Sequence, residues 1–179
     1  MPNGITFDMV DLWVQDEARF GQQGKTTRMW YKKGSRPRAI KQLQFTNAYL
    51  FGAVCPSKDL SAAIIVPYVG IVAMQEHLNE ISKQVPPGRH AVIIVDRAAW
   101  HMGKNLDIPK NISLLPQPPY SPELNSCEQI WQYLREHYLS NVSFSGYEDI
   151  LNRVSKAWNK FVNSPGRIKS LCSRSWMVC

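Results

Sequence analysis

Five stretches of this chain combine apolar residues with β-forming side chains and predict strands. They cover residues 11–20, 45–54, 62–68, 90–95 and 112–115. A short polar loop separates the second stretch from the third, which predicts an antiparallel hairpin. Residues 90–95 form an unbroken apolar run, typical of a central strand that is covered on both faces.

Helical spacing appears in three other stretches. The first stripe is Ile71, Met74, Leu78, Ile81 and Val85, and the Pro-Pro-Gly at 86–88 ends it. The second stripe is Cys127, Ile130, Trp131, Leu134 and Tyr138. The third helix opens with a capping-box pattern at 145–148 and continues to Val162. The order β-β-β-α-β-β-α-α predicts an α/β fold, with three antiparallel strands followed by parallel strands and helices on both faces.

Composition is consistent with one domain spanning residues 1–179. The 44% hydrophobic and 20% charged content is ordinary for a globular protein, and no linker divides the chain. The longest apolar stretch is broken by Pro67 and Gly70 and is too short to span a bilayer. Four cysteines without paired spacing favour neither a zinc site nor a disulfide framework. A soluble, cytoplasmic protein is expected.

The net charge of +7 points to a polyanionic partner, with nucleic acid ahead of simple solubility. Basic side chains concentrate in one irregular segment, with Trp30 and Tyr31 between them: Lys25, Arg28, Lys32, Lys33, Arg36, Arg38 and Lys41. This mixture suits contacts to phosphates together with base stacking. A solvated basic loop is the structural alternative.

Three carboxylates are candidates for metal chemistry. Asp16 and Asp96 each end an apolar, strand-like run, and Glu128 lies near a helix start. Carboxylates brought to one point form a cage for hard divalent cations. Each has an ordinary alternative: Asp96 can cap the next element, Asp16 can be a solvated edge charge, and Glu128 can complete a capping box with Asn125. The two-residue period of a strand directs Glu17 to the opposite face, so only one residue of the Asp16–Glu17 pair can face Asp96.

His101 follows Asp96 by five positions, next to Trp100. One hypothesis is that this histidine is a metal ligand. An imidazole at a surface turn more often makes a hydrogen bond or contacts a phosphate, so we assign His101 to the predicted nucleic-acid contacts.

Several motifs together resemble one family. They are Gln-Asp-Glu-Ala-Arg-Phe-Gly at 15–21, Arg28-Met-Trp30 with Lys-Gly-Ser-Arg-Pro at 33–37, Val95-Asp96 with Trp100-His101, and Pro-Pro-Tyr-Ser-Pro-Glu-Leu-Asn at 118–125 before Glu128. The chain resembles, over nearly its whole length, the catalytic domain of mariner-type (Tc/mariner superfamily) bacterial insertion-sequence transposases. These belong to the DDE superfamily of RNase H-like nucleotidyl transferases.

The resemblance implies a function as well as a fold. Asp16, Asp96 and Glu128 would be catalytic and would bind two Mg²⁺ or Mn²⁺ ions. The activity would be cleavage of DNA at transposon ends and strand transfer into target DNA. A homodimer on DNA and a bacterial, nucleoid-associated location are also implied.

The sequence departs from the family pattern at two places near the predicted site. Arg97 stands where a small or amide residue is usual, and Ser126-Cys127 replaces a proline and an aliphatic residue. Fifteen residues precede Asp16, too few for the helix-turn-helix module of related transposases. We therefore expect that module to be absent from this chain, and either encoded separately in another reading frame or lost from a decayed gene. An inactive nucleic-acid-binding remnant and an RNase H-like nuclease without strand transfer are the alternatives.

Overall fold

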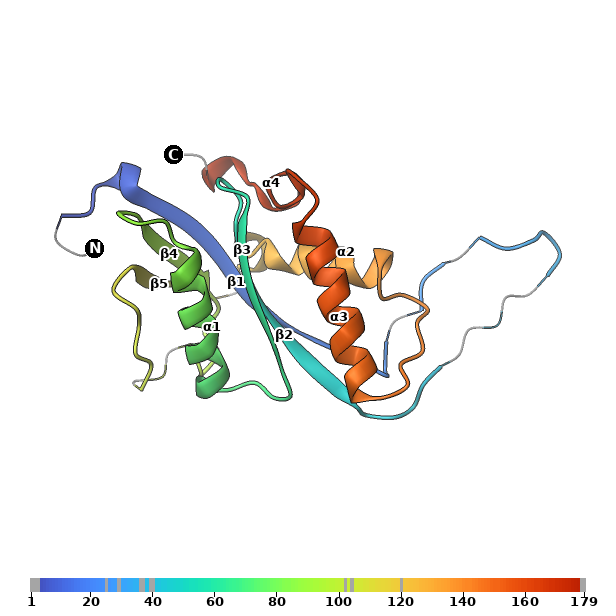
Figure 1. The fold of residues 1–179 in the computed structure, drawn as a ribbon. Helices are drawn as coiled ribbons and strands as arrows, with labels where there is room; N and C mark the ends of the chain where they lie inside the picture. Colours follow the sequence, from blue (N-terminus) through green and yellow to red (C-terminus); the bar gives the residue numbers. More distant parts are fainter. Residues whose placement is uncertain are drawn as a thin grey trace.

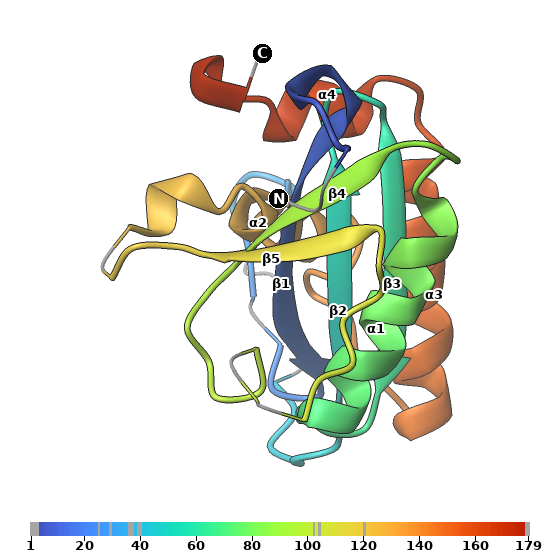
Figure 2. The same cartoon turned by 90° about the vertical axis from the view of Figure 1, so that its left-hand side faces the viewer.

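A single mixed sheet organises the chain in the computed structural model, which describes residues 4–24, 26–28, 30–35, 38, 41–101, 103, 105–119 and 121–177. Its strand order is β3-β2-β1-β4-β5, so β3 and β5 form the edges (Figures 1 and 2). The strands are β1 (Val10–Gly21), β2 (Asn47–Cys55), β3 (Leu60–Val66), β4 (His90–Val95) and β5 (Ile112–Pro116). β2 pairs antiparallel with β1 and β3, while β4 pairs parallel with β1 and β5.

Helices cover both faces of this sheet. They are α1 (Ile71–Gln84), α2 (Cys127–His137), α3 (Tyr147–Val162) and α4 (Arg167–Cys172). Figure 1 shows α1 on one side of the strands and α2 and α3 on the other. In the described part of the chain, no helix is long and apolar enough to cross a membrane.

Two separate hydrophobic clusters result from this layering. Trp13 of β1 packs in the cluster under α1, whereas its neighbour Val14 packs in the cluster under α2 and α3. Alternate residues of a strand point to opposite faces, so a central strand serves both clusters. β4 does the same with Ile93 and Ile94, which explains why residues 90–95 form an unbroken apolar run.

The predicted order of elements is confirmed, with some differences at the boundaries. The short helix α4 was not predicted, because its six residues are too few to display a period. The predicted capping box at 145–148 is wrong in detail: α3 takes Gly146 as its N-cap, and the amide of Ser145 donates to Asp149 Oδ2 at 3.1 Å.

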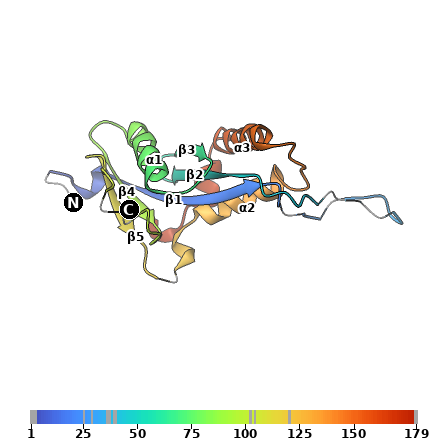
Figure 3. The same cartoon turned by 90° about the horizontal axis from the view of Figure 1, so that it is seen from below.

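The segment between β1 and β2 extends away from the sheet, and we call its described residues within 22–46 the arm (Figures 1 and 3). Its base is attached to the loop before α3. Gln42 donates to the Phe144 carbonyl at 2.7 Å and accepts from the Phe144 amide at 2.7 Å, and Gln22 donates to the same carbonyl at 2.9 Å. The basic segment predicted from the sequence therefore leaves the sheet from a fixed base.

Candidate active site

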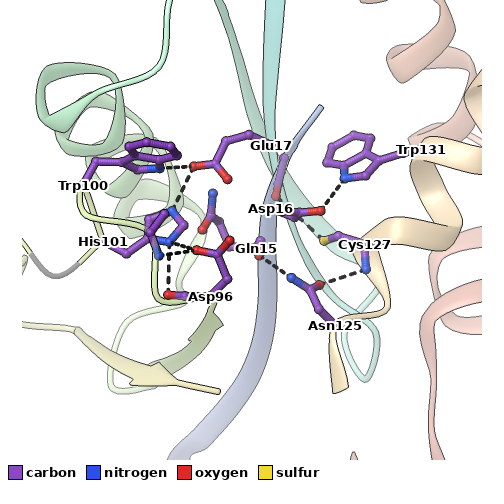
Figure 4. Close-up of polar contacts among 11 residues, drawn as sticks. Gln15, Asp16, Glu17, Asp96, Trp100, His101, Asn125, Cys127 and Trp131 are labelled. Carbon is purple, nitrogen blue, oxygen red and sulfur yellow. Dashed lines mark hydrogen bonds and ion pairs between the residues drawn. The ribbon is translucent and has the colours of Figure 1, made fainter. Parts of the chain in front are cut away.

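Two adjacent carboxylates on β1 point to opposite faces of the sheet. Asp16 shares its face with Val14 and Ala18, which pack in the cluster under α2 and α3. Glu17 points to the α1 side, where it contacts Trp100 and His101 (Figure 4). Asp16 also lies inside β1 and not at its end as expected, since the strand continues to Gly21.

Asp96 follows β4 directly, at the carboxyl end of a central strand as predicted. In the parallel pairing of β1 with β4, Val14 lies beside Ile94. The paired residues end there, so the register of β1 with β4 reaches neither Asp16 nor Asp96. The Asp96 carboxylate instead contacts His101, whose other ring nitrogen contacts Glu17, and in Figure 4 these three side chains lie together while Asp16 reaches Trp131. The expectation that Asp16, and not Glu17, faces Asp96 therefore stays a prediction.

Asp16 is partly buried and has few donors. Its Oδ2 accepts a hydrogen bond of 2.8 Å from the indole Nε1–H of Trp131 on α2. The pKa of Asp16 is raised to about 6, because burial and the negative charges of Glu17 and Asp96 together outweigh the opposing effect of the Trp131 bond. The ionised form of Asp16 is therefore short of compensating positive charge.

Glu17 lies in the opposite kind of environment. Its Oε1 accepts from Trp100 Nε1 at 2.7 Å and from His101 Nε2 at 2.9 Å, while His101 Nδ1 contacts Asp96 Oδ1 at 2.6 Å (Figure 4). Burial lowers the pKa of His101, but the bonds and charges of Glu17 and Asp96 outweigh it and raise the pKa above its ordinary value. A protonated His101 donates to both carboxylates and joins Glu17 to Asp96.

This placement differs from the surface phosphate contact predicted for His101. The residue is 2% exposed, and both of its ring nitrogens are taken by carboxylates. The sequence contained no sign that Glu17 and His101, 84 positions apart, would meet. The turn after Asp96 folds inward, where the imidazole of His101 and the indole of Trp100 both contact Glu17.

Glu128 lies in the first turn of α2 and is exposed. Trp131 follows it by one turn on the same helix and contacts Asp16, so α2 brings Glu128 to the same part of the sheet. Within the described residues, no three His, Cys, Asp or Glu side chains are close enough together to hold a metal ion. The described structure therefore does not gather the three carboxylates into a cage, and their convergence on a metal ion stays a prediction.

The predicted capping box of Asn125 with Glu128 is wrong in detail, because α2 takes Ser126 as its N-cap. Asn125 Oδ1 accepts the amide of Cys127 at 3.1 Å, and its Nδ2 donates to the Gln15 carbonyl at 2.8 Å. Among the described contacts, Glu128 makes no return bond to Asn125. Asn125 thus ties the start of α2 to β1 immediately before Asp16, and the Glu128 carboxylate stays free of a capping role.

A second set of predicted residues lies on the arm. Arg28, Lys32, Lys33 and Arg38 are exposed there, while Lys25 and Arg36 fall outside the described residues. Trp30 and Tyr31 are exposed as well.

At the base of the arm is a pocket of about 400 Å³, whose lining includes Arg19, Phe20, Phe45, Asn47, Arg135 and Phe144. The guanidinium of Arg135 lies over the Phe20 ring, 5.2 Å from its centroid.

Comparison with known proteins defines the family of this chain. Residues 11–151 match the family model described as DDE superfamily endonuclease, and the chain belongs to that family. It is also 49% identical over 129 residues to the uncharacterized protein y4pE/y4sA of Sinorhizobium fredii, covering 72% of this chain and 96% of that protein. The resemblance drawn from the motifs is confirmed at the level of the family.

Solved structures of the Mos1 mariner transposase share the fold. The paired-end complex with Mn matches with a TM-score of 0.67 at 15% identity, over 89% of this chain. The strand transfer complex matches with a TM-score of 0.65 at 15% identity, over 92% of this chain. The chain spans about half the length of these Mos1 chains, 50% in each case. The predicted RNase H-like mixed sheet is confirmed.

Proposed function

We propose that this chain is the catalytic domain of a DDE transposase that cleaves DNA at transposon ends and transfers the strand with a divalent metal ion. One observation carries the proposal. Asp16 is partly buried beside the like charge of Asp96, with one indole donor and a pKa raised to about 6. A carboxylate in that state is stabilised by a cation, and DDE endonucleases are the family to which the chain belongs.

The residues present fit a hard divalent cation. Carboxylate oxygens are the ligands that Mg²⁺ prefers, and Asp16, Asp96 and Glu128 would supply them. The described contacts of Asp96 use only Oδ1, from His101 and the amide of Ala98. Oδ2 of this half-exposed side chain remains available to a ligand. Two of the Mos1 structures are named as complexes with Mn and with Mg, which supports the choice of metal.

The bound metal would act as a Lewis acid that activates water or a 3′-hydroxyl and stabilises the leaving oxygen of the phosphodiester. The protein's own contribution is orientation. His101 and the Ala98 amide fix one oxygen of Asp96, and Trp131 fixes one oxygen of Asp16. Both aspartates are therefore held before substrate arrives, which reduces the reorganisation that the reaction requires.

The test is metal-dependent nicking of DNA that carries the element's own ends, taken from the sequence flanking the gene. Wild-type protein should nick with Mg²⁺ or Mn²⁺, and Asp96→Asn should not. Glu80→Gln, at a partly exposed carboxylate on α1 that pairs with Lys83, is the matched control. Equal cleavage by Asp96→Asn and wild type would rule out the assignment. Calorimetric titration tests the alternative of an inactive remnant. That alternative predicts no divalent-ion binding, so clear binding that is lost in Asp16→Asn would eliminate it.

Strand transfer needs its own experiment, because a simple nuclease with this fold would also nick. A pre-cut end with a free 3′-hydroxyl is supplied together with target DNA. Joined product is expected from a transposase, and nicking without any joined product would favour the nuclease alternative.

The arm is the proposed surface for the DNA backbone, since its exposed lysines and arginines surround two exposed aromatic rings. Replacing Lys32 and Lys33 with alanine should weaken DNA binding and reduce the salt slope by about 2. Replacing Lys156 and Lys169, exposed on α3 and α4, is the control. An unchanged slope in the arm variant would remove the arm from the interface. A homodimer on DNA and a separately encoded helix-turn-helix partner remain predictions, which sizing and footprinting of the chain on end DNA can check.

A further inference from the structure

The contact between Trp131 and Asp16 joins two elements that lie far apart in the sequence. Trp131 is 3% exposed, and its indole N–H lies 2.8 Å from Asp16 Oδ2 (Figure 4). The indole N–H of this tryptophan therefore bonds to a carboxylate, while its ring packs in the hydrophobic cluster.

A glycine on the neighbouring strand leaves the room that the ring of Trp131 occupies. Gly52 of β2 lies directly across from Asp16 in the β1–β2 pairing. A Cβ added at Gly52 would lie 2.6 Å from Trp131 Cη2 and 2.9 Å from Trp158 Cη2. Any larger residue would push the rings away from the sheet. Gly52 thus makes the space in which the indole reaches the residue opposite.

Other aromatic contacts fix the direction of this indole. The Trp131 ring meets Phe20 edge-on with a centroid separation of 6.4 Å, and Trp158 at 6.1 Å. Close packing on several sides leaves the side chain few alternative rotamers. The N–H is consequently a preorganised donor, aimed at one oxygen of Asp16.

The same contact also fixes α2 relative to β1. Glu128 lies three residues before Trp131, which is about 4.5 Å along a helix axis. A bond that ties Trp131 to Asp16 therefore limits how far Glu128 can move from Asp16. Partners that orient metal ligands in this way typically change metal affinity about 10- to 100-fold when they are lost.

We propose that Trp131 is a positioning residue that holds the Asp16 carboxylate for metal binding, and that Gly52 is required to seat its ring. The inference rests on the proposed function and extends it, because it assigns a role to two residues outside the three carboxylates. Trp131 touches neither substrate nor metal in this account and acts through Asp16.

A spectroscopic test examines the bond without requiring any activity. The indole resonances of Trp131 and Trp158 are assigned in ¹⁵N spectra by their loss in Trp131→Phe and Trp158→Phe. Asp16→Asn replaces a charged acceptor by a neutral one, so the Trp131 indole proton should move upfield while that of Trp158 stays in place. A Trp131 indole proton that does not respond to Asp16→Asn overturns the inference, whatever the protein does to DNA.

The functional test compares variants across metal concentrations. Trp131→Phe keeps the ring and removes the donor, and it should raise the Mg²⁺ concentration for half-maximal nicking about tenfold or more. High Mg²⁺ should restore Trp131→Phe but not Asp16→Asn. Trp176→Phe is the control, because it loses an exposed tryptophan that makes none of the described contacts of Trp131 or Asp16. Thermal unfolding of each variant shows that the fold is retained.

Gly52→Ala provides an independent approach, since it leaves both tryptophans in the chain and displaces them. Like Trp131→Phe, it should raise the Mg²⁺ concentration needed for half-maximal nicking. If wild type binds Mn²⁺ and nicks DNA while Trp131→Phe needs the same metal concentration as wild type, the role of Trp131 is ruled out and the proposed function is unaffected. If wild type neither binds Mn²⁺ nor nicks DNA, the proposed function fails and the metal role of Trp131 fails with it.

Discussion

Asp16 and Glu17 are adjacent on β1, yet the two faces of the sheet give them different surroundings. Glu17 accepts from both Trp100 and His101 on the α1 side. Asp16, on the α2 side, has one indole donor and the nearby charge of Asp96. The first carboxylate is compensated within the protein, and the second is not. The same functional group is therefore a structural partner on one face and a candidate ligand on the other.

The difference shows that burial and charge compensation together separate the two roles. Glu17 is as buried as a core residue, with 8% of its side chain exposed, but a protonated imidazole offsets its charge. Asp16 makes no ion pair among the described residues, and the weaker attraction of Arg135 does not prevent the pKa of Asp16 from rising. A cation supplied from outside would complete the environment of Asp16, whereas at Glu17 it would compete with His101.

The largest effect expected from this contrast is on DNA nicking. Asp16→Asn removes a proposed ligand and should reduce the metal-dependent rate about 1,000-fold or more, equivalent to about 4 kcal/mol. Glu17→Gln should reduce it much less, because it loosens the support of Asp96 without removing a ligand. Single-turnover rates of the two variants measure the difference, and equal losses would break the distinction between the faces.

Stability should respond in the opposite order. Glu17→Gln removes the charged partner of His101 and should lower the free energy of unfolding by about 2 kcal/mol. A histidine whose folded pKa is raised contributes stability that is fully present below its unfolded pKa of 6.5 and is lost as pH rises through the folded pKa. The cost should therefore be clear at pH 6 and small at pH 9 in urea unfolding. Glu80→Gln, whose partner Lys83 is exposed, should change little at either pH.

The apo protein should gain stability from Asp16→Asn at neutral pH. The folded pKa of Asp16 is about 6 against an ordinary 3.8, so ionising it in the folded state is unfavourable. The penalty is absent below pH 4, grows as pH rises through 6 and is complete above it. Asp16→Asn should thus be more stable than wild type by about 1–3 kcal/mol at pH 7, with the difference closing near pH 4. A variant less stable than wild type at pH 7 would contradict the view that Asp16 lacks compensation.

The smallest effect is a thermal shift with metal. Mg²⁺ at ten times its dissociation constant should stabilise wild type by about 1.4 kcal/mol, which is a few degrees for a chain of this size. Glu17→Gln should keep most of the shift and Asp16→Asn should lose it. A shift that persists in Asp16→Asn would place the metal elsewhere.

Much of the fold could be predicted because its signals are local. The two-residue period of β1 and the helical stripe from Ile71 to Val85 depend only on which positions are apolar. The same alternation distinguished Asp16 from Glu17 before any contact was known. The position of Asp96 after a continuous apolar strand was equally local, and β4 ends at Val95 in the structure.

The site's supporting contacts could not be read in this way. Trp131 was assigned to the apolar stripe of its helix, which is correct for its ring but does not indicate the direction of its N–H. His101 was expected at the surface, because nothing near it in the sequence offers two carboxylates. Gly52 showed no sign of its role, since the rings that exclude a Cβ come from α2 and α3.

The sequence by itself determined the order of the main elements and the family, because periodicity and motifs are properties of short segments. The metal site of Asp16, Asp96 and Glu128 stays a prediction. Only the tertiary structure decided which carboxylate is compensated and which is left short of positive charge. That outcome depends on α2 packing Trp131 against β1 from 115 positions away, and on the turn after β4 bringing His101 to Glu17. Hydrogen-bond direction and burial arise from packing between distant segments.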